Sequence, residues 1–435
     1  MNDIKTYPKV LVISHNCFST SGSNGRTLGN FFVNWPKEAI AQFFIFNEIP
    51  DSSVCENYFR VTDTEALKAF YKGSEAGRIV RNETLFKQDE NSEALLNKIY
   101  RRHRKKTSVN YIARNLIWDS KRWISKRFID WINEFNPDVL LLQIGDFSFM
   151  IKIAMSIAKE RKIPVVLYNS EDYYFKNKKT ISPLYHYYRY QYKKNFETLL
   201  DYASHTIYIC DKLQDTYNKQ FRHESTVLMT ATSMVPLLKD KEDNDPPIIC
   251  YLGNLGIGRH ESLIEIANTL QEISPNLYLH VYGKIPNELV NSAFNTCAGI
   301  RYKGLVSYDE VVRIMQDSDL LVHAENFSEF SKWDLKHAFS TKIADCLASG
   351  TCFFVYAPED IACTEYLKGN NGALVVTDKI DLKGSLVRLI NDKELRQSYI
   401  DTAQKIVSKR HNARDNAEYI KRIVNDTVAK VSGFK

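Results

Sequence analysis

Two glycines and an arginine stand together where they could bind a phosphate. In YLGNLGIGRHESLIEIANTL (251–270), Gly256 and Gly258 lie in a turn between an expected strand and an expected helix, and Arg259 follows at once. Glycines let backbone approach a ligand, and arginine can contact a phosphate with two parallel hydrogen bonds. A lone arginine on a surface loop is the ordinary alternative. The glycines and the strand-end position together favour the phosphate site.

A second basic residue opens the stretch AFSTKIADCLASGT (338–351). By itself this stretch predicts an ordinary short helix, with Thr341 as the N-cap and Gly350 at the end. Because it follows the loop after an expected buried strand, its N-terminus should face the ligand edge of the sheet. Free N–H groups, the Ser340 hydroxyl and Lys342 would then converge on one anion, with Asp345 one turn further on.

Several carboxylates follow expected strands. The stretch LLVHAENF (320–327) ends a buried strand with His323 and Glu325. Asp146 follows the run at 138–144, and the pair Glu171-Asp172 follows the run at 164–169. Acids at neighbouring strand ends could orient or deprotonate a hydroxyl, whereas ordinary loop acids are the alternative. Asp317-Ser318-Asp319 imitates a metal-binding Asp-x-Asp motif but precedes its strand, so we reject it as a metal site.

The elements that position these residues alternate between strands and helices. We predict strands at 9–14, 43–46, 138–144, 164–169, 205–210 and 226–229, and again at 248–253, 277–283, 300–304, 320–325, 352–357 and 373–376. Continuous apolar runs separated by amphipathic helices indicate parallel sheets covered on both faces. The pattern predicts two consecutive doubly wound α/β domains.

The domain boundaries follow from a polar, Pro-terminated break, LLKDKEDNDPP. We expect a first domain at 1–236, a linker at 237–247, a second domain at 248–411, and a C-terminal helix at 412–435 returning toward the first domain. In the first domain a small flexible turn with Gly22 and Gly25 separates the first strand from the first helix, where a ligand could bind.

The bulk composition describes an ordinary globular protein. The chain has 435 residues, 25% charged, a length that favours two domains. Its eight scattered cysteines form no metal-binding or disulfide pattern and indicate a reducing compartment. Without a signal-peptide pattern or a run of about 20 apolar residues, we expect a cytoplasmic protein.

The positive charge is concentrated in one segment, within a helical insertion expected at about 85–131. Between Lys98 and Arg127 there are eleven Lys and Arg against one acid, Asp119, with tryptophans interleaved. Such a segment (about 98–131) is typical of a helix lying on anionic inner-leaflet lipid. The alternative is a solvated basic helix whose tryptophans pack on their own domain. We do not expect nucleic acid as a partner, because no recognition motif accompanies the charge.

Together these residues resemble the GT-B glycosyltransferases, especially the retaining family 4 enzymes of bacterial surface polysaccharide synthesis. The resemblance spans nearly the whole chain and is strongest from Tyr251 to Val376, where GNLGIGR, VYGK, KGLVSYDE, LVHAENF and STKIADCLASGT occur in that family's order. It implies two Rossmann-like domains facing a cleft, with a UDP- or GDP-linked sugar in the second and an acceptor in the first. The implied reaction moves the sugar to a hydroxyl of a lipid-linked or growing glycan, with retention and without a metal or other cofactor, at the inner face of the plasma membrane.

The resemblance also implies roles for single residues. Arg259 and Lys342 would hold the diphosphate, and their charge would stand in for a metal. Where many relatives have two glutamates in a Glu-x7-Glu pattern, this chain has His337 and Asp345. Asp345 would accept a ribose hydroxyl, and His337 or Glu325 would contact the donor sugar. Gly283, Lys284 and Val306 would border the nucleobase, and Gly22 and Gly25 would contact the phosphate or the donor sugar. Ala357 and Pro358 lie in the loop that would face the phosphate. In the first domain, Asp146 would contact the acceptor, and Glu171 and Asp172 would be the catalytic acids.

Two other functions fit the same fold. A nucleotide-sugar epimerase would need its acid and base in the donor pocket and would not need a lipid acceptor. A non-catalytic scaffold that pairs with an active transferase would account for the altered Glu-x7-Glu positions.

Overall fold

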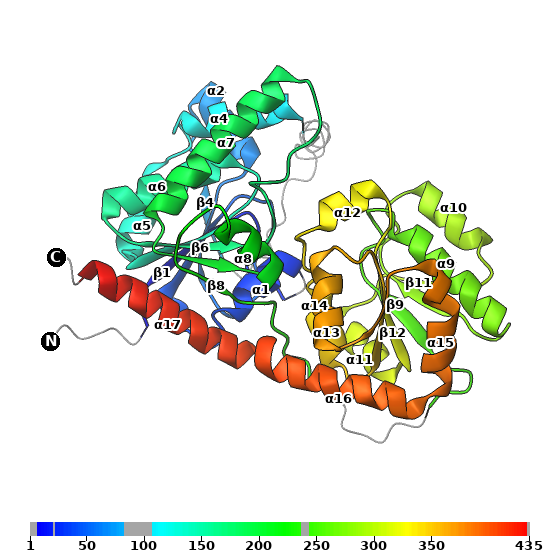
Figure 1. Ribbon diagram of the computed structural model, residues 1–435. Coiled ribbons are helices and arrows are strands. Elements are labelled where there is room, and N and C mark those ends of the chain that lie inside the picture. The colour runs from blue at the N-terminus through cyan, green and yellow to red at the C-terminus, as the bar shows by residue number, and fades with distance from the viewer. Residues whose placement is uncertain (1–6, 21, 82–106, 236–242, 433–435) are drawn as a thin grey trace. The chain divides into compact units, whose positions relative to one another are not determined.

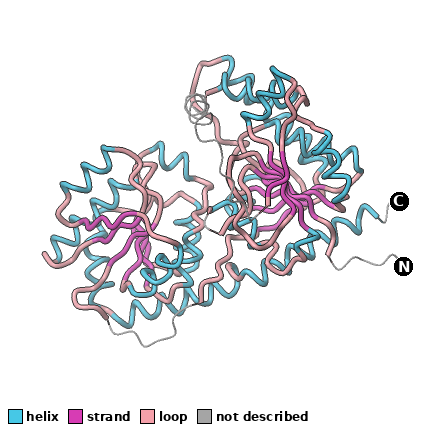
Figure 2. The backbone as a smooth tube through the Cα atoms, turned by 180° about the vertical axis from the view of Figure 1, so that it is seen from behind, coloured by secondary structure: helices cyan, strands magenta, loops and turns pink. Residues whose placement is uncertain are grey.

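The computed structural model describes residues 7–20, 22–81, 107–235 and 243–432 (Figure 1). The chain divides into two compact units. Unit 1 comprises Met1–Leu228 and Arg414–Lys435, and unit 2 comprises Met229–Ala413. Figure 2 shows that each unit is built around a sheet with helices on both faces. The described helices include none long and apolar enough to cross a bilayer.

Unit 1 contains an eight-stranded sheet in the order β4-β3-β2-β1-β5-β6-β7-β8. All its neighbouring pairs are parallel except β3 and β4, which are antiparallel. The strands are β1 (Val10–Ser14), β2 (Ile40–Phe44), β3 (Asn57–Arg60), β4 (Arg78–Val80), β5 (Val139–Gln143), β6 (Val165–Asn169), β7 (His205–Tyr208) and β8 (Ser225–Val227). The order reverses between β1 and β5, and this pair forms the switch point of unit 1.

Two features of this sheet differ from the sequence prediction. The strand expected at 43–46 begins three residues earlier, at Ile40. It ends at Phe44, because the N–H groups of Ile45 and Phe46 donate to the His15 carbonyl instead of extending the ladder. The short strands β3 and β4 were not predicted. β3 consists of the four residues NYFR and β4 of the three residues RIV. Strands this short give no periodic signal in the sequence.

Four helices of unit 1, α2 (Asp63–Lys72), α4 (Ser108–Asp119), α5 (Lys126–Phe135) and α7 (Pro183–Tyr202), begin after a Ser or Thr whose side chain caps them. Thr62 and Glu65 form a reciprocal capping box at α2, and Ser182 caps α7, which has proline at its first position. The other helices are α1 (Ser23–Asn30), η1 (Lys37–Ala39), α6 (Ser148–Arg161) and α8 (Asp211–Asn218). The last helix, α17 (Ala413–Ser432), adds Ile420, Ile423 and Val424 to the core of unit 1.

The tryptophans of the basic segment are buried in unit 1, so the alternative in which they pack on their own domain is confirmed for residues 107–131. Trp118 is 2% exposed and stacks on Phe149, with ring centroids 4.7 Å apart. Its indole N–H donates to Asp63, which also holds Arg114 through two hydrogen bonds. Burial of large aromatic rings outweighs any gain from a membrane surface. The remainder of the predicted insertion and membrane segment, up to residue 106, lies outside the described residues.

Unit 2 contains a parallel six-stranded sheet in the order β11-β10-β9-β12-β13-β14. Its strands are β9 (Ile249–Leu252), β10 (Leu279–Tyr282), β11 (Ile300–Gly304), β12 (Leu320–Ala324), β13 (Cys352–Tyr356) and β14 (Leu374–Val376). This is the 3-2-1-4-5-6 order of a Rossmann sheet, and it reverses between β9 and β12. Every strand of this sheet lies within a range predicted from sequence, and the strands β9, β12 and β13 at its centre are fully buried.

The helices of unit 2 enclose this sheet. They are α9 (Arg259–Ile273), α10 (Glu288–Thr296), α11 (Tyr308–Asp317), α12 (Glu329–Leu335), α13 (Lys342–Ala348), α14 (Ala362–Asn370), η2 (Lys379–Asp381), α15 (Leu382–Asn391) and α16 (Lys393–Arg410). α12 was not predicted. At the amino end of the sheet, the Asp319 carboxylate accepts hydrogen bonds from Ile248 N–H and Asn244, which explains an acid there without a metal.

Candidate active site

The switch point of unit 2, between β9 and β12, brings together the two basic residues that the sequence selected. Arg259 begins α9 after the loop that leaves β9, and Lys342 begins α13. Glu325 follows the carboxyl end of β12. Ligands of doubly wound sheets bind outside the carboxyl ends of the strands at such a reversal, so this cluster is the candidate active site.

Contacts with Asn326 and Asn254 fix the shape of the glycine-rich loop. Gly258 has φ +73°, and a Cβ there would lie 2.9 Å from the Asn326 side chain. Asn326 fixes the loop in return, by donating to the Gly258 carbonyl at 3.1 Å. The Gly256 N–H is 2.7 Å from the Asn254 side-chain oxygen, which closes the turn.

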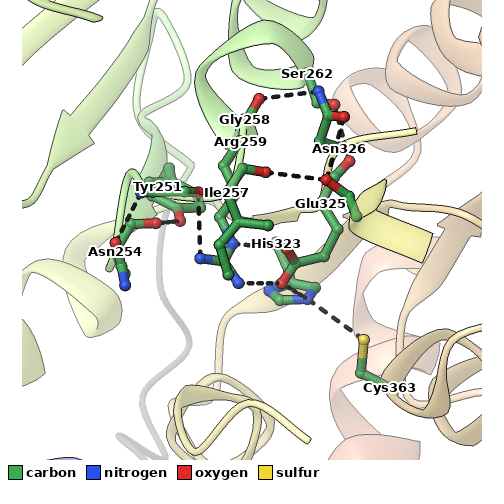
Figure 3. A network of polar contacts seen from close by, with 12 residues as sticks. Tyr251, Asn254, Ile257, Gly258, Arg259, Ser262, His323, Glu325, Asn326 and Cys363 are labelled. Atoms are coloured by element: carbon green, nitrogen blue, oxygen red, sulfur yellow. Dashed lines mark hydrogen bonds and ion pairs between the residues drawn. The ribbon is translucent and has the colours of Figure 1, made fainter. Parts of the chain in front are cut away.

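Arg259 is held by Glu325 in a two-pronged ion pair. Its Nε and Nη2 atoms lie 2.6 and 2.9 Å from the two carboxylate oxygens (Figure 3). Both residues are buried, with Glu325 only 2% exposed. Arg259 is therefore a fixed and paired cation. The ordinary alternative, a solvated arginine on a surface loop, does not describe it.

His323 lies beneath this pair and is neutral. Its ring is completely buried, and Nε2 lies 3.4 Å from Glu325 and 3.7 Å from the Cys363 sulfur. Burial, reinforced by the positive charges of Lys342 and Arg259, holds the pKa of His323 well below its usual value. The neutral imidazole leaves the charge of Glu325 to be balanced by Arg259.

The Lys342 ammonium is buried without a hydrogen-bond partner among the described residues. It lies 3.9 Å from the centroid of the Tyr251 ring, a favourable but weak cation–π contact. Gly253 makes room for it, since a Cβ there would lie 3.0 Å from Nζ. Burial and the nearby Arg259 lower the pKa of Lys342 to about 8. An anion beside Nζ would relieve both effects.

The start of α13 differs from the expected cap. Thr341 has helical backbone angles and its side chain caps no N–H group, so the prediction of Thr341 as N-cap is wrong. Its neighbour Ser340 is half-buried, and the Ser340 carbonyl accepts from Ile343 N–H. Asp345 is 3% exposed and accepts a hydrogen bond from Thr232 at 2.7 Å. A ribose contact at Asp345 would share the carboxylate with that threonine.

The residues implied at the nucleobase lie at the ends of the next strands. Gly283 follows β10, where a Cβ would come 2.1 Å from the Gly253 carbonyl, so the two strand ends meet closely. Lys284 is exposed beside it, and Val306, after β11, is half-buried. Two further predicted residues, Pro358 after β13 and His337 after α12, are buried.

In unit 1 the predicted carboxylates lie after neighbouring strands and already accept hydrogen bonds. Asp146, after β5, accepts from the Tyr111 hydroxyl at 2.6 Å. Glu171, after β6, accepts from Tyr173 at 2.9 Å and lies 3.2 Å from Lys176.

Asp172 is 5% exposed and shapes its own loop. Its carboxylate accepts from the Phe175 N–H at 2.8 Å and from the Tyr217 hydroxyl at 3.1 Å. Of the two predicted catalytic acids, Glu171 is therefore the more accessible.

The predicted flexible turn at Gly22 and Gly25 is shorter than expected. α1 already begins at Ser23, so Gly25 lies in the first turn of a helix. A Cβ at Gly25 would lie 2.3 Å from the Cys17 carbonyl, so packing alone requires this glycine. Gly22 precedes the helix, and its N–H donates to the Ser19 hydroxyl at 3.0 Å.

Sequence reasoning missed Tyr251, Asn326 and Tyr111. Tyr251 sits in a buried strand, where a tyrosine looks like any core aromatic, and only the tertiary structure shows Lys342 on its face. Asn326 directly follows the predicted Glu325, and this position was the available signal. Tyr111 lies 35 residues from its partner Asp146, which no local pattern reveals.

Comparison with known proteins identifies the fold. Residues 259–422 match the family model described as glycosyl transferase-like. No curated protein matches the chain. The sucrose-phosphate synthase from Thermosynechococcus elongatus is 12% identical, with a TM-score of 0.60 over 97% of this chain and 99% of that one. HepE from Anabaena, solved with UDP, is 10% identical, with a TM-score of 0.60 over 96% and 100%.

A glycosyltransferase from Rickettsia africae is also similar, at 12% identity and a TM-score of 0.55 over 96% of this chain and 98% of that one. The fold is that of the GT-B glycosyltransferases, so the predicted fold is confirmed. The match to the glycosyl transferase-like model begins at Arg259 and covers less than half of the chain. The assignment to the retaining family 4 enzymes stays a prediction.

Proposed function

We propose that the protein transfers a sugar from a nucleotide-sugar donor to a hydroxyl acceptor, with the diphosphate of the donor bound at the switch point of unit 2. The observation that carries this proposal is the buried Lys342 ammonium beside the Arg259–Glu325 pair, at the edge where doubly wound sheets bind ligands. The match of residues 259–422 to a glycosyl transferase-like family supports it, as does the similarity to HepE, which was solved with UDP and with UDP-glucose.

The chemistry follows from charge. The bond between the anomeric carbon and the diphosphate oxygen breaks as the acceptor oxygen forms a new bond to that carbon. Negative charge develops on the leaving diphosphate, whose oxygen then takes the proton that the acceptor hydroxyl loses. A buried ammonium stabilises that charge more than it stabilises the intact donor, because water does not screen it. Lys342 therefore serves as an electrostatic catalyst, with the Arg259–Glu325 pair beside it.

The direct test is a thermal-shift screen of the whole protein against UDP-, GDP-, ADP- and TDP-linked sugars. A ligand that binds only the folded state raises the melting temperature. We expect one nucleotide series to do so in the wild type and not in Lys342→Met. If every series leaves the melting temperature unchanged, the proposed donor site is wrong.

We further propose a lipid-linked or growing glycan as acceptor, retention of the anomeric configuration, and no requirement for a metal. The acidic strand ends of unit 1 support a hydroxyl acceptor, and the eleven basic residues between 98 and 127 support docking on anionic lipid. Because the aromatic residues are buried, docking would depend on charge and would weaken steeply with salt. Flotation with phosphatidylglycerol vesicles at low and high salt, and NMR of the product anomer with EDTA present, test these points.

A further inference from the structure

Arg259 and Lys342 differ in how their charges are balanced. Arg259 gives two hydrogen bonds to Glu325, whereas the Lys342 ammonium has no hydrogen-bond partner among the described residues. This inference rests on the proposed function and concerns how the two cations divide the work.

The charged groups around Lys342 can be counted. The groups with the largest influence on the charge of Lys342 are Arg259, Glu325 and two thiols, Cys346 and Cys363. Burial raises the pKa of both thiols to about 12, so they are neutral. His323 is neutral for the reasons given above. One carboxylate therefore faces two cations, and its geometry assigns it to Arg259.

We infer that Glu325 is a positioning residue that fixes Arg259 as one half of a neutral buried pair and leaves Lys342 as the cation that meets the diphosphate. The sequence suggested that Glu325 contacts the donor sugar. Its two carboxylate oxygens instead face the guanidinium, at 2.6 and 2.9 Å (Figure 3).

The backbone holds Glu325 in this role. Its N–H donates to the Tyr356 carbonyl and its carbonyl accepts from Ser262 at 2.8 Å, so the residue is tied to β13 and α9. A carboxylate fixed so close to the anion site repels the donor as well as positioning Arg259. Removing its charge should therefore increase anion affinity, while removing Lys342 should abolish it.

The test measures binding of inorganic pyrophosphate by calorimetry, near neutral pH and at low salt, with UDP and GDP measured in parallel. In Glu325→Gln the amide keeps the shape and loses the charge, and we expect binding at least about fivefold tighter than in the wild type. In Lys342→Met we expect binding at least about tenfold weaker. Damage to the fold would weaken binding, so a gain in affinity separates an electrostatic role from a structural one.

A double variant, Arg259→Gln with Glu325→Gln, leaves the net charge of the site unchanged because it removes one positive and one negative group. It provides the test if the single variant Glu325→Gln does not fold. We expect it to lose clearly less pyrophosphate affinity than Lys342→Met does. A loss as large as that of Lys342→Met, or weaker binding in Glu325→Gln, overturns the inference and leaves the proposed function standing. If the wild type binds neither pyrophosphate nor UDP nor GDP, and no nucleotide sugar raises its melting temperature, the proposed function fails and the inference fails with it.

Discussion

The two switch points of this protein have the same geometry and opposite chemistry. Between β9 and β12, unit 2 places two cations and one buried carboxylate. Between β1 and β5, unit 1 places His15 and Asp146 with a surrounding group of tyrosines. At each switch point the two strands are parallel and the strand order reverses, so the loops alone decide the chemistry. The cationic edge suits the donor diphosphate and the acidic edge suits a hydroxyl.

The supporting structure differs as well. In unit 2, Arg259 follows the loop that leaves β9, and Glu325 directly follows β12. Unit 1 depends on α4, which brings Tyr111 to Asp146 and is anchored by Trp118. Burial holds the pKa of Tyr111 above its usual value, so it stays protonated and donates to Asp146.

Loss of the α4 anchor should produce the largest effect. Trp118→Ala removes a ring that stacks on Phe149 and hydrogen-bonds Asp63, and we expect unit 1 to lose about 3–5 kcal/mol in its free energy of unfolding. Urea unfolding followed by circular dichroism measures this. The control is Ile181→Ala, at a residue 99% exposed, with an expected change within about 0.5 kcal/mol. Equal effects of the two variants would contradict the assignment of Trp118 to the core.

At the cationic edge, Lys342→Met should lower kcat about 100- to 1,000-fold, as loss of one oxyanion-stabilising group does. The measurement is the initial rate with the donor that the thermal-shift screen identifies. Lys368→Met is the matched control, because that lysine forms an exposed ion pair with Glu359 in the same unit and should leave the rate unchanged. Near-normal rates in Lys342→Met would remove it from the site.

At the acidic edge, Asp146→Asn should reduce kcat/KM for the acceptor by about tenfold and leave donor affinity unchanged, because the contact to Tyr111 survives without the charge. Varying acceptor and donor separately measures the two effects. Asp215→Asn, on the exposed surface of α8, serves as the control. A change confined to donor affinity would contradict the division between the two edges.

The smallest expected effect concerns pH. The folded pKa of Lys342, about 8, lies below its ordinary value of 10.5, so the unfolded chain binds more protons between these values. The free energy of unfolding should therefore rise with pH across this interval in the ligand-free protein. A gain of about 1 kcal/mol corresponds to about 2–4 °C in melting temperature for a domain of this size.

The comparison is the melting temperature of the wild type minus that of Lys342→Met, measured from pH 8 to 10.5. We expect this difference to increase, while donor affinity falls as Lys342 loses its proton. A constant difference would show that Lys342 is not a buried charge.

The sequence by itself determined the two Rossmann-like sheets and the location of the basic site. The central strands of unit 2 are buried along their whole length, and the local order of strand, glycine turn and helix places Arg259 at a strand end. These are short-range features, and hydrophobic periodicity records them directly. The short strands β3 and β4 carry too few residues for that signal.

Only the tertiary structure decided which charges are paired. Arg259 and Glu325 are 66 residues apart, and Lys342 rests on a tyrosine 91 positions earlier in the sequence. The same holds for the tryptophans of the basic segment, whose spacing fits a membrane surface as well as a core. Side-chain partners across such separations depend on how helices pack on the sheet, and burial then sets whether a charge is neutralised or left for a ligand.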